Sequence, residues 1–171
     1  MTRHSQVLNR RAARLLFAVV AALVAAVFSS TARRSPPTEG LVSRVIDGDT
    51  VALADGRHVR YIGIDTPELR RLEGGQWRLD PEPYAAKAAE ANRALVEGKR
   101  VRLEFDVDPT DRYGRSLAYV YVGEMMVNER LLAEGYAHLL IIRPNVRYVD
   151  RLRQAEEDAQ QAGRGLWSGG R

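Results

Sequence analysis

A chain of 171 residues is long enough for one domain with a substantial hydrophobic core, and it is short for two. Cysteine is absent, which excludes disulfides, zinc–thiolate centres and thiol nucleophiles. The formal charge of +4 comes from residues 1–32: they hold four arginines and no acidic residue, and without them 22 basic residues balance 22 acidic ones. Net charge is therefore no argument for a polyanionic partner.

Residues 1–32 have the pattern of an export signal. Arginines precede the apolar run of residues 15–28, and the small residues 29–32 follow, which predicts cleavage after about Ala32. The run is short for a membrane-spanning helix, which needs roughly 20 apolar residues, but a retained N-terminal membrane anchor is the alternative. We expect an exported protein, secreted or held in the cell envelope, in which residues 33–40 form a polar linker.

Three short strands are predicted at residues 41–46, 50–54 and 58–64, with Asp55-Gly56 as the turn between the last two. Residues 69–83 contain two adjacent glycines and two prolines, and we interpret them as a long mobile loop. An alanine-rich helix follows and ends at Gly98. Alternating apolar and charged residues predict a strand at 101–106, and the apolar segment 117–122 predicts a central strand.

Two further helices are predicted, one over residues 128–134 and a longer one that begins near Tyr148 and ends at Gly163. Five strands, with a helix before the fourth and helices after the fifth, indicate a β-rich α+β fold. The natural candidate is a five-stranded OB-fold barrel with three helices, occupying residues 41–168. No oligomer interface is recognisable in the sequence, so we expect a monomer.

The stretch Asp47-Gly48-Asp49-Thr50 interrupts two strand-like runs. Asp-Gly is a strong hairpin signal, because glycine adopts positive φ without steric cost and aspartate bonds its own backbone. A turn, however, does not need the second carboxylate, Asp49. A short acidic loop can instead hold a hard cation, so this stretch alone leaves both readings open.

Two other segments concentrate charge in the same way. In RYIGIDTPE, Arg60 lies within a strand and residues 65–68 follow its end. In DRYGRSLAY, Gly114 turns the chain and Arg115 leads into the apolar strand. Taken singly, each arginine is a solvated surface charge and residues 65–68 resemble a helix start.

Taken together, the motifs IDGDT, R-x4-DTPE and DRYGR-x-LAY, in this order, resemble the staphylococcal nuclease (thermonuclease) family. The resemblance runs from about Leu41 to Trp167. It implies an OB barrel with three helices. It also implies calcium-dependent hydrolysis of phosphodiester bonds in DNA and RNA, with 3′-phosphate products.

The catalytic residues implied by the resemblance agree with the chemistry. A phosphodiester concentrates negative charge on its oxygens as water attacks, so a catalyst needs cationic donors aimed at them. Arg60 and Arg115 match the family's two catalytic arginines and supply planar forks that lysine could not imitate. Glu68 matches the family's candidate general base, which would activate or orient the water.

Binding residues are implied by the same positions. The side chains of Asp49 and Asp65 and the backbone carbonyl of Thr66 match the family's calcium ligands, and calcium takes such hard oxygen donors. Arg112 and Tyr113 match positions beside the nucleotide, where the tyrosine would stack on a base or bond a phosphate.

Residues 136–143 depart from the family, because they are apolar where the family has an aromatic that lines the nucleotide pocket. Two other functions stay open. The chain could be a catalytically silent OB-fold module that binds nucleic acid while tethered at the membrane. It could also be a structural calcium-binding domain, although that leaves Arg60 and Arg115 unexplained.

Overall fold

A computed structural model describes residues 38–169 of the chain, apart from the side chains of residues 70–73 and 77. The predicted signal or anchor and nearly all of the predicted linker lie outside the described residues, and they stay predictions. Within residues 38–169, no helix is both long enough and apolar enough to cross a membrane.

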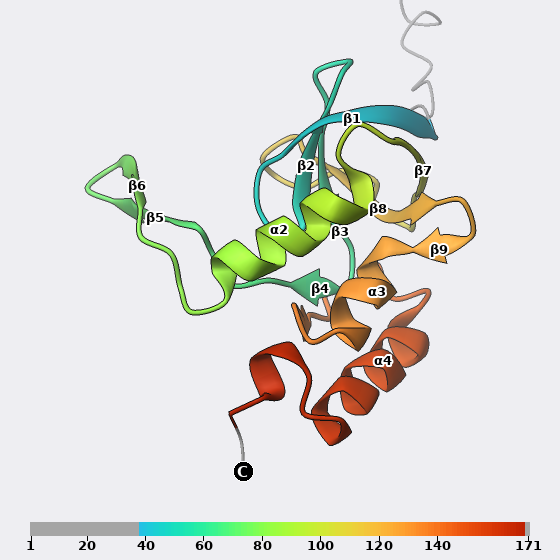
Figure 1. The fold of residues 1–171 in the computed structure, drawn as a ribbon. Helices are drawn as coiled ribbons and strands as arrows, with labels where there is room; N and C mark the ends of the chain where they lie inside the picture. The colour runs from blue at the N-terminus through green and yellow to red at the C-terminus, as the bar shows by residue number, and fades with distance from the viewer. Residues whose placement is uncertain (1–37, 170–171) are drawn as a thin grey trace, which may run out of the picture. The chain divides into compact units, whose positions relative to one another are not determined.

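Five strands form a closed barrel (Figure 1): β1 (Glu39–Val45), β2 (Thr50–Leu53), β3 (His58–Tyr61), β7 (Arg100–Glu104) and β8 (Ser116–Val122). They neighbour one another in the order β3-β2-β1-β7-β8, and a parallel pairing of β3 with β8 closes the circle. A short β9 (Met125–Met126) pairs with β8 on its other edge. The predicted five-stranded OB barrel is confirmed, with its first strand beginning two residues earlier than expected.

The barrel strands turn apolar side chains inward. Val42, Val51, Val59, Leu103 and Val120 are buried in one continuous core. Burial of such a side chain contributes about 1.5–3 kcal/mol, and β-branched residues suit the pleated surface of a sheet. In β7 the buried positions alternate with exposed or half-buried ones, as the sequence pattern predicted.

The described region has three α-helices, α2 (Ala85–Val96), α3 (Val127–Ala133) and α4 (Val149–Gln161), of which α2 and α3 contact barrel strands. Helix α3 contacts α2, α4 and β8, which places it between the barrel and the C-terminal helix. The predicted glycine stops are confirmed, because Gly98, Gly135 and Gly163 follow the helices with positive φ. A short 3-10 helix, η1 (Gly165–Trp167), ends the fold.

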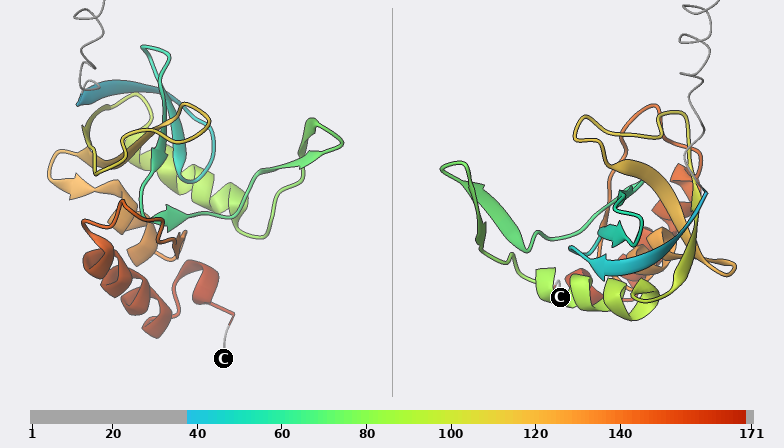
Figure 2. Two further views of the ribbon diagram at one scale, coloured as in Figure 1. Left: turned by 180° about the vertical axis from the view of Figure 1, so that it is seen from behind. Right: turned by 90° about the horizontal axis from the view of Figure 1, so that it is seen from above.

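The segment 69–83 is not the loop that the sequence analysis predicted. Strands β5 (Arg70–Glu73) and β6 (Gln76–Leu79) form an antiparallel hairpin that projects from the barrel (Figure 2). Gly74 and Gly75 occupy the turn with φ of 58° and 80°. Two central residues with positive φ give the turn whose twist matches a hairpin. The loop prediction was wrong because we took the glycine pair as a sign of mobility.

The predicted strand 58–64 is in fact divided. Strand β3 ends at Tyr61, Gly63 turns the chain with a φ of 83°, and β4 (Ile64–Asp65) pairs instead with β10 (His138–Leu139). This turn directs residues 65–68 out of the barrel wall. The buried side chain of Asn128 fixes it, donating to the Ile62 carbonyl at 2.8 Å and accepting the Val120 N–H at 2.9 Å.

Candidate active site

A cleft of about 610 Å³ opens beside β3, between the turn at residues 108–115 and the segment 140–145. It brings together five of the eight residues that the sequence analysis assigned to the site: Arg60, Glu68, Arg112, Tyr113 and Arg115. The three expected metal ligands are not among the cleft residues: Asp49 and Asp65 contact Arg60, and Thr66 contacts Asp49.

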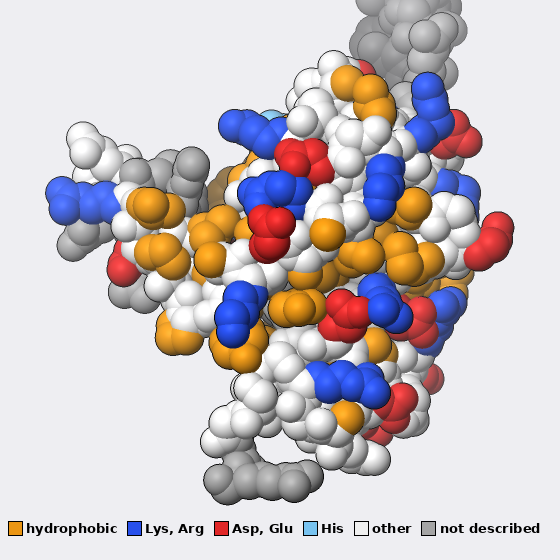
Figure 3. All heavy atoms as spheres, in the orientation of Figure 1, with side chains coloured by type: hydrophobic (Ala, Val, Ile, Leu, Met, Phe, Trp, Pro, Cys, Tyr) orange, Lys and Arg blue, Asp and Glu red, His pale blue; other side chains and the backbone are white. Residues whose placement is uncertain are grey.

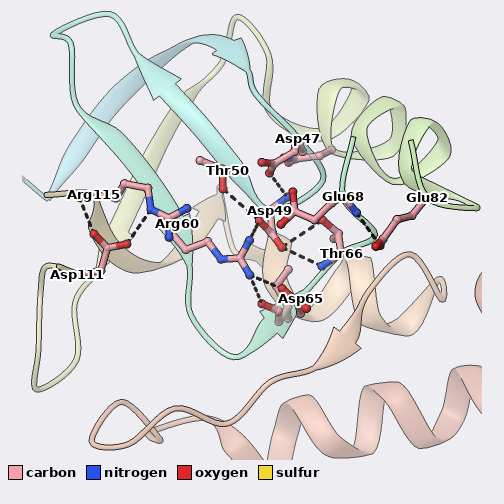
Figure 4. A network of polar contacts seen from close by, with 12 residues as sticks. Asp47, Asp49, Thr50, Arg60, Asp65, Thr66, Glu68, Glu82, Asp111 and Arg115 are labelled. Atoms are coloured by element: carbon pink, nitrogen blue, oxygen red, sulfur yellow. Dashed lines mark hydrogen bonds and ion pairs between the residues drawn. The ribbon is translucent and has the colours of Figure 1, made fainter. Parts of the chain in front are cut away.

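Arg60 is fixed by two carboxylates at once (Figure 4). Its Nη1 donates to Asp49, and its Nη2 donates to Asp65 Oδ1 at 2.6 Å and to the Ile64 carbonyl at 3.3 Å. Only 13% of the side chain is exposed. The alternative of a solvated strand residue is therefore wrong, and the guanidinium has a set direction at the edge of the cleft.

The carboxylate of Asp49 is completely buried. Besides Arg60, it accepts the Thr66 N–H at 2.9 Å and the hydroxyls of Thr66 and Thr50, each at 3.1 Å. Burial raises the pKa of Asp49 to about 8, although Arg60 and the Thr66 N–H oppose the rise. Further positive charge beside this carboxylate would therefore stabilise its ionised form.

The turn before Asp49 is built differently from the expected Asp-Gly hairpin turn. Asp47 does bond its own backbone, since its Oδ1 accepts the Asp49 N–H at 3.1 Å. Gly48, however, is not among the glycines with positive φ. A Cβ on Gly48 would lie 2.6 Å from the Thr66 hydroxyl oxygen, so glycine is needed here for close approach of Thr66.

Glu68 lies at the point where the chain leaves the barrel and enters the β5–β6 hairpin. Its carboxylate lines the cleft and has no hydrogen-bond or ion-pair partner among the side chains that the structure describes. Burial raises the pKa of Glu68, and the charges of Asp47 and Asp65 add to the rise while Arg60 opposes it. A carboxylate more basic than usual and without a partner is suited to accept a proton from water.

Arg115 is held by Asp111, a residue to which the sequence analysis gave no role. Asp111 accepts the backbone N–H groups of Tyr113 and Arg115 at 2.9 and 3.0 Å, and it binds Arg115 Nε at 2.7 Å. Burial alone would raise the pKa of Asp111, but these hydrogen bonds outweigh it and lower the pKa. The Asp-x-x-Gly turn pattern could have identified this role.

Arg112 and Tyr113 lie together at the mouth of the cleft. The tyrosine is 69% exposed, and Arg112 donates to its hydroxyl at 2.7 Å while its guanidinium lies 4.8 Å from the ring centre. Most of the tyrosine ring is therefore accessible at the mouth of the cleft.

The opposite wall of the cleft is aliphatic, as the apolar stretch 136–143 suggested. Leu140 and Ile142 line it, and Ile142 is 64% exposed. Asn145 joins this wall to the other one, because its side chain bonds both the N–H and the carbonyl of Asp108 at 2.8 Å. Nothing local in the sequence identifies Asn145, since its partner is 37 residues away.

The expected metal ligands are linked through Arg60. Among the residues that the structure describes, no three acidic or histidine side chains converge into a metal-binding group. Asp49 and Asp65 both contact Arg60, and Thr66 contacts Asp49. These donors are nevertheless hard oxygens of the kind that calcium takes. The residues present therefore fit calcium.

Comparison with known proteins identifies the family. The family described as "Staphylococcal nuclease homologue" matches residues 58–169. The chain belongs to this family. The thermonucleases of Staphylococcus hyicus and Staphylococcus intermedius are 41% and 40% identical to it over 130 residues, which cover 74% of this chain and 74% of each relative. Endonuclease YncB of Bacillus subtilis (strain 168) is 39% identical over 132 residues, 74% of this chain and 60% of that protein.

Membership makes this protein an enzyme, a nuclease of the phosphodiesterase type. Its surface charge is mixed: on the face drawn in Figure 3, acidic and basic side chains of the described residues are interspersed. This agrees with the balanced charge of residues 33–171. Net charge therefore gives no argument for recognition of a polyanion.

Proposed function

We propose that this staphylococcal nuclease family member hydrolyses phosphodiester bonds in DNA and RNA, depends on calcium and leaves 3′-phosphates. The observation that carries the proposal is that Arg60, Glu68 and Arg115, from three separate elements, line one cleft. A pair of cationic forks and a carboxylate free to accept a proton are the groups that phosphodiester hydrolysis needs.

Arg115 acts on the phosphate oxygens. Its Nε is occupied by Asp111, and within the described part of the chain no other hydrogen bond is formed by its side chain. The two terminal nitrogens are therefore available to donate to non-bridging oxygens as their charge rises during attack. Arg60 adds positive charge to the same cleft, with its direction set by Asp49 and Asp65.

Glu68 accepts the proton of the attacking water. The water oxygen forms a bond to phosphorus, the bond from phosphorus to the 5′-oxygen breaks, and the 5′-oxygen leaves and takes a proton from solvent. The phosphate then stays on the 3′-oxygen, which accounts for the proposed products. General-base help of this kind contributes about 10² to 10⁴ in rate.

Calcium would be held by the carboxylates of Asp49 and Asp65 and the carbonyl of Thr66. When bound, it would supply Lewis-acid polarisation of a phosphate oxygen. The chain's own contribution is to hold Asp49 in place through the hydroxyl and N–H of Thr66, so that one ligand is fixed before the cation arrives. Magnesium should support little activity, because it demands tight octahedral geometry.

The deciding experiment is hydrolysis of single-stranded and duplex DNA by residues 33–171, with calcium and then with excess chelator, beside a Glu68→Gln control. Cleavage that needs calcium and falls by about 10² to 10⁴ in the control supports the proposal. DNA binding without cleavage under both conditions would favour the silent binding module instead.

We also propose that residues 1–32 direct the nuclease out of the cytoplasm, on the basis of their charged, apolar and small-residue segments. Mass spectrometry of the protein from its native host tests this proposal. A mature N-terminus near residue 33 supports a cleaved signal, and an intact N-terminus in the membrane fraction supports the anchor.

A further inference from the structure

The base of the β5–β6 hairpin contains a contact that neither the catalytic nor the metal assignment explains. The carboxylate of Glu82 accepts the backbone N–H of Glu68 at 3.1 Å (Figure 4). In return, the N–H of Glu82 donates to the carbonyl of Glu68 at 2.9 Å. Glu82 thus binds both polar groups of the Glu68 backbone from 14 residues away.

An acidic side chain is an unfavourable choice for a purely structural contact at this place. Glu68 and Glu82 carry the same charge, and like charges at close range oppose each other. A backbone bond already closes the base of the hairpin, because the N–H of Asp80 donates to the Leu69 carbonyl at 3.3 Å. The hydrogen bond from the Glu82 side chain restrains the Glu68 backbone in addition to this backbone closure.

The residues before Glu68 are restrained independently. Thr66 is bonded to the buried Asp49, and Pro67 is buried and has a fixed φ. Beyond Glu68 the chain enters the hairpin, which projects from the barrel (Figure 2). From the hairpin side, the two bonds from Glu82 restrain the Glu68 backbone directly.

We propose that Glu82 is a positioning residue that fixes the backbone of Glu68 and thereby the direction in which the Glu68 carboxylate enters the cleft. This inference rests on the proposed role of Glu68 as general base. A general base must come within about 2.6–3.2 Å of the group whose proton it takes, and a displacement of about 1 Å can cost about 10²-fold in rate. A restraint on one peptide is therefore significant for catalysis.

The kinetic test compares Glu82→Ala with Glu82→Gln in the full chain, with DNA as substrate and calcium present. Glutamine keeps an oxygen that can accept the Glu68 N–H, whereas alanine does not. Glu82→Ala should lower kcat by about 10- to 100-fold with little change in KM, as loss of a supporting contact does elsewhere. Glu82→Gln should retain most of the wild-type kcat.

Glu90→Ala is the matched control, because it removes the same charge from an exposed position on α2, where Glu90 pairs with Arg93. It should leave kcat unchanged. Equal losses in Glu82→Ala and Glu82→Gln would show that charge matters rather than the hydrogen bond, and this would overturn the inference. A wild-type kcat in Glu82→Ala would overturn it too.

Two further measurements separate this inference from the function on which it rests. In a Glu68→Gln background, Glu82→Ala should have no additional effect on kcat, because the group it positions is already missing. Hydrogen exchange of the Glu68 amide, followed by NMR, should be slow in wild type and Glu82→Gln and fast in Glu82→Ala. Equal exchange in wild type and Glu82→Ala would contradict the contact whatever the activity. A slow amide in an inactive wild type would contradict the general-base role and, with it, the positioning inference.

Discussion

The two arginines of the cleft are held in opposite ways. Arg60 belongs to a barrel strand, is largely buried, and donates to two carboxylates and a carbonyl. Arg115 belongs to a surface turn and keeps 32% of its side chain exposed, and among the described residues its one ion pair is with Asp111 in the same turn. One arginine is part of the fold as well as of the site, while the other leaves most of its donors for a ligand.

The difference follows from where the carboxylates lie. Asp49 is fully buried, so without its positive partner this carboxylate must either stay charged in a low-dielectric environment or bind a proton. The Asp111 side chain is partly exposed (15%), and it is bonded by backbone N–H groups that stay when the Arg115 side chain is removed. Stability and catalysis should therefore be coupled at Arg60 and separable at Arg115.

Substitution of Arg60 should have the largest effect. Arg60→Ala should lower turnover by about 10² to 10³, because it removes an electrostatic donor from the cleft. It should also lower the free energy of unfolding by about 3–5 kcal/mol, the usual loss when one partner of a buried ion pair is removed. Turnover and urea unfolding in the presence of chelator check the two parts, since a bound cation would mask the loss.

The double variant Arg60→Ala with Asp49→Asn is the control for stability. It removes the buried charge together with its partner, so it should recover part of the lost stability without recovering turnover. Equal stability of the wild type and Arg60→Ala would contradict the view that Arg60 belongs to the fold.

Arg115→Ala should lower turnover by about the same 10² to 10³. Its free energy of unfolding should change by less than about 1 kcal/mol, because partly exposed ion pairs within one turn contribute little. Steady-state kinetics and urea unfolding of the same preparation test both statements. Arg115→Lys should not restore turnover, since an ammonium cannot form the planar fork. A large stability loss in Arg115→Ala would remove the contrast between the two arginines.

Gly48→Ala should have an intermediate effect on stability. It acts next to Asp49, the buried partner of Arg60. The new Cβ would lie 2.6 Å from the Thr66 hydroxyl, so Thr66 must move away from Asp49. Overpacking of this kind costs about 1–3 kcal/mol. Thermal or urea unfolding measures it, and a variant as stable as wild type would show that the approach of Thr66 is not restrictive.

Much of the barrel could be predicted because apolar residues alternate along its strands and glycines follow its helices. The three sequence motifs were enough to predict that Arg60, Glu68 and Arg115 belong to one site. The β5–β6 hairpin was missed because a glycine pair suits both a mobile loop and a tight turn, and the sequence alone does not distinguish the two.

The residues that support the site were harder to identify, for a physical reason. Sequence patterns report side-chain type and local period, whereas Glu82, Asn145 and Asp111 act by bonding particular backbone groups. Two of these partners are 14 and 37 residues away, so their positions depend on the finished fold. In the sequence, Arg60 likewise resembles an ordinary strand residue. Only the folded structure shows that its side chain bonds Asp49 and Asp65.

The smallest expected effect is the pH dependence of stability at the Arg115 turn. The pKa of Asp111 is lower in the folded protein than its usual value, so between the two pKa values the unfolded chain binds more protons than the folded one. Its contribution to stability is therefore complete above the ordinary aspartate pKa of about 3.9 and is lost as the pH falls through the lowered value.

The urea midpoint of wild type should drop more between pH 5 and pH 3 than that of Asp111→Asn, whose amide cannot titrate. Arg60→Ala leaves the turn around Asp111 intact. The part of the fall in its urea midpoint between pH 5 and pH 3 that comes from Asp111 should therefore equal that of the wild type. Identical pH profiles for wild type and Asp111→Asn would mean that the carboxylate gains nothing from the turn, and Arg115 would then need another group to hold it in the cleft.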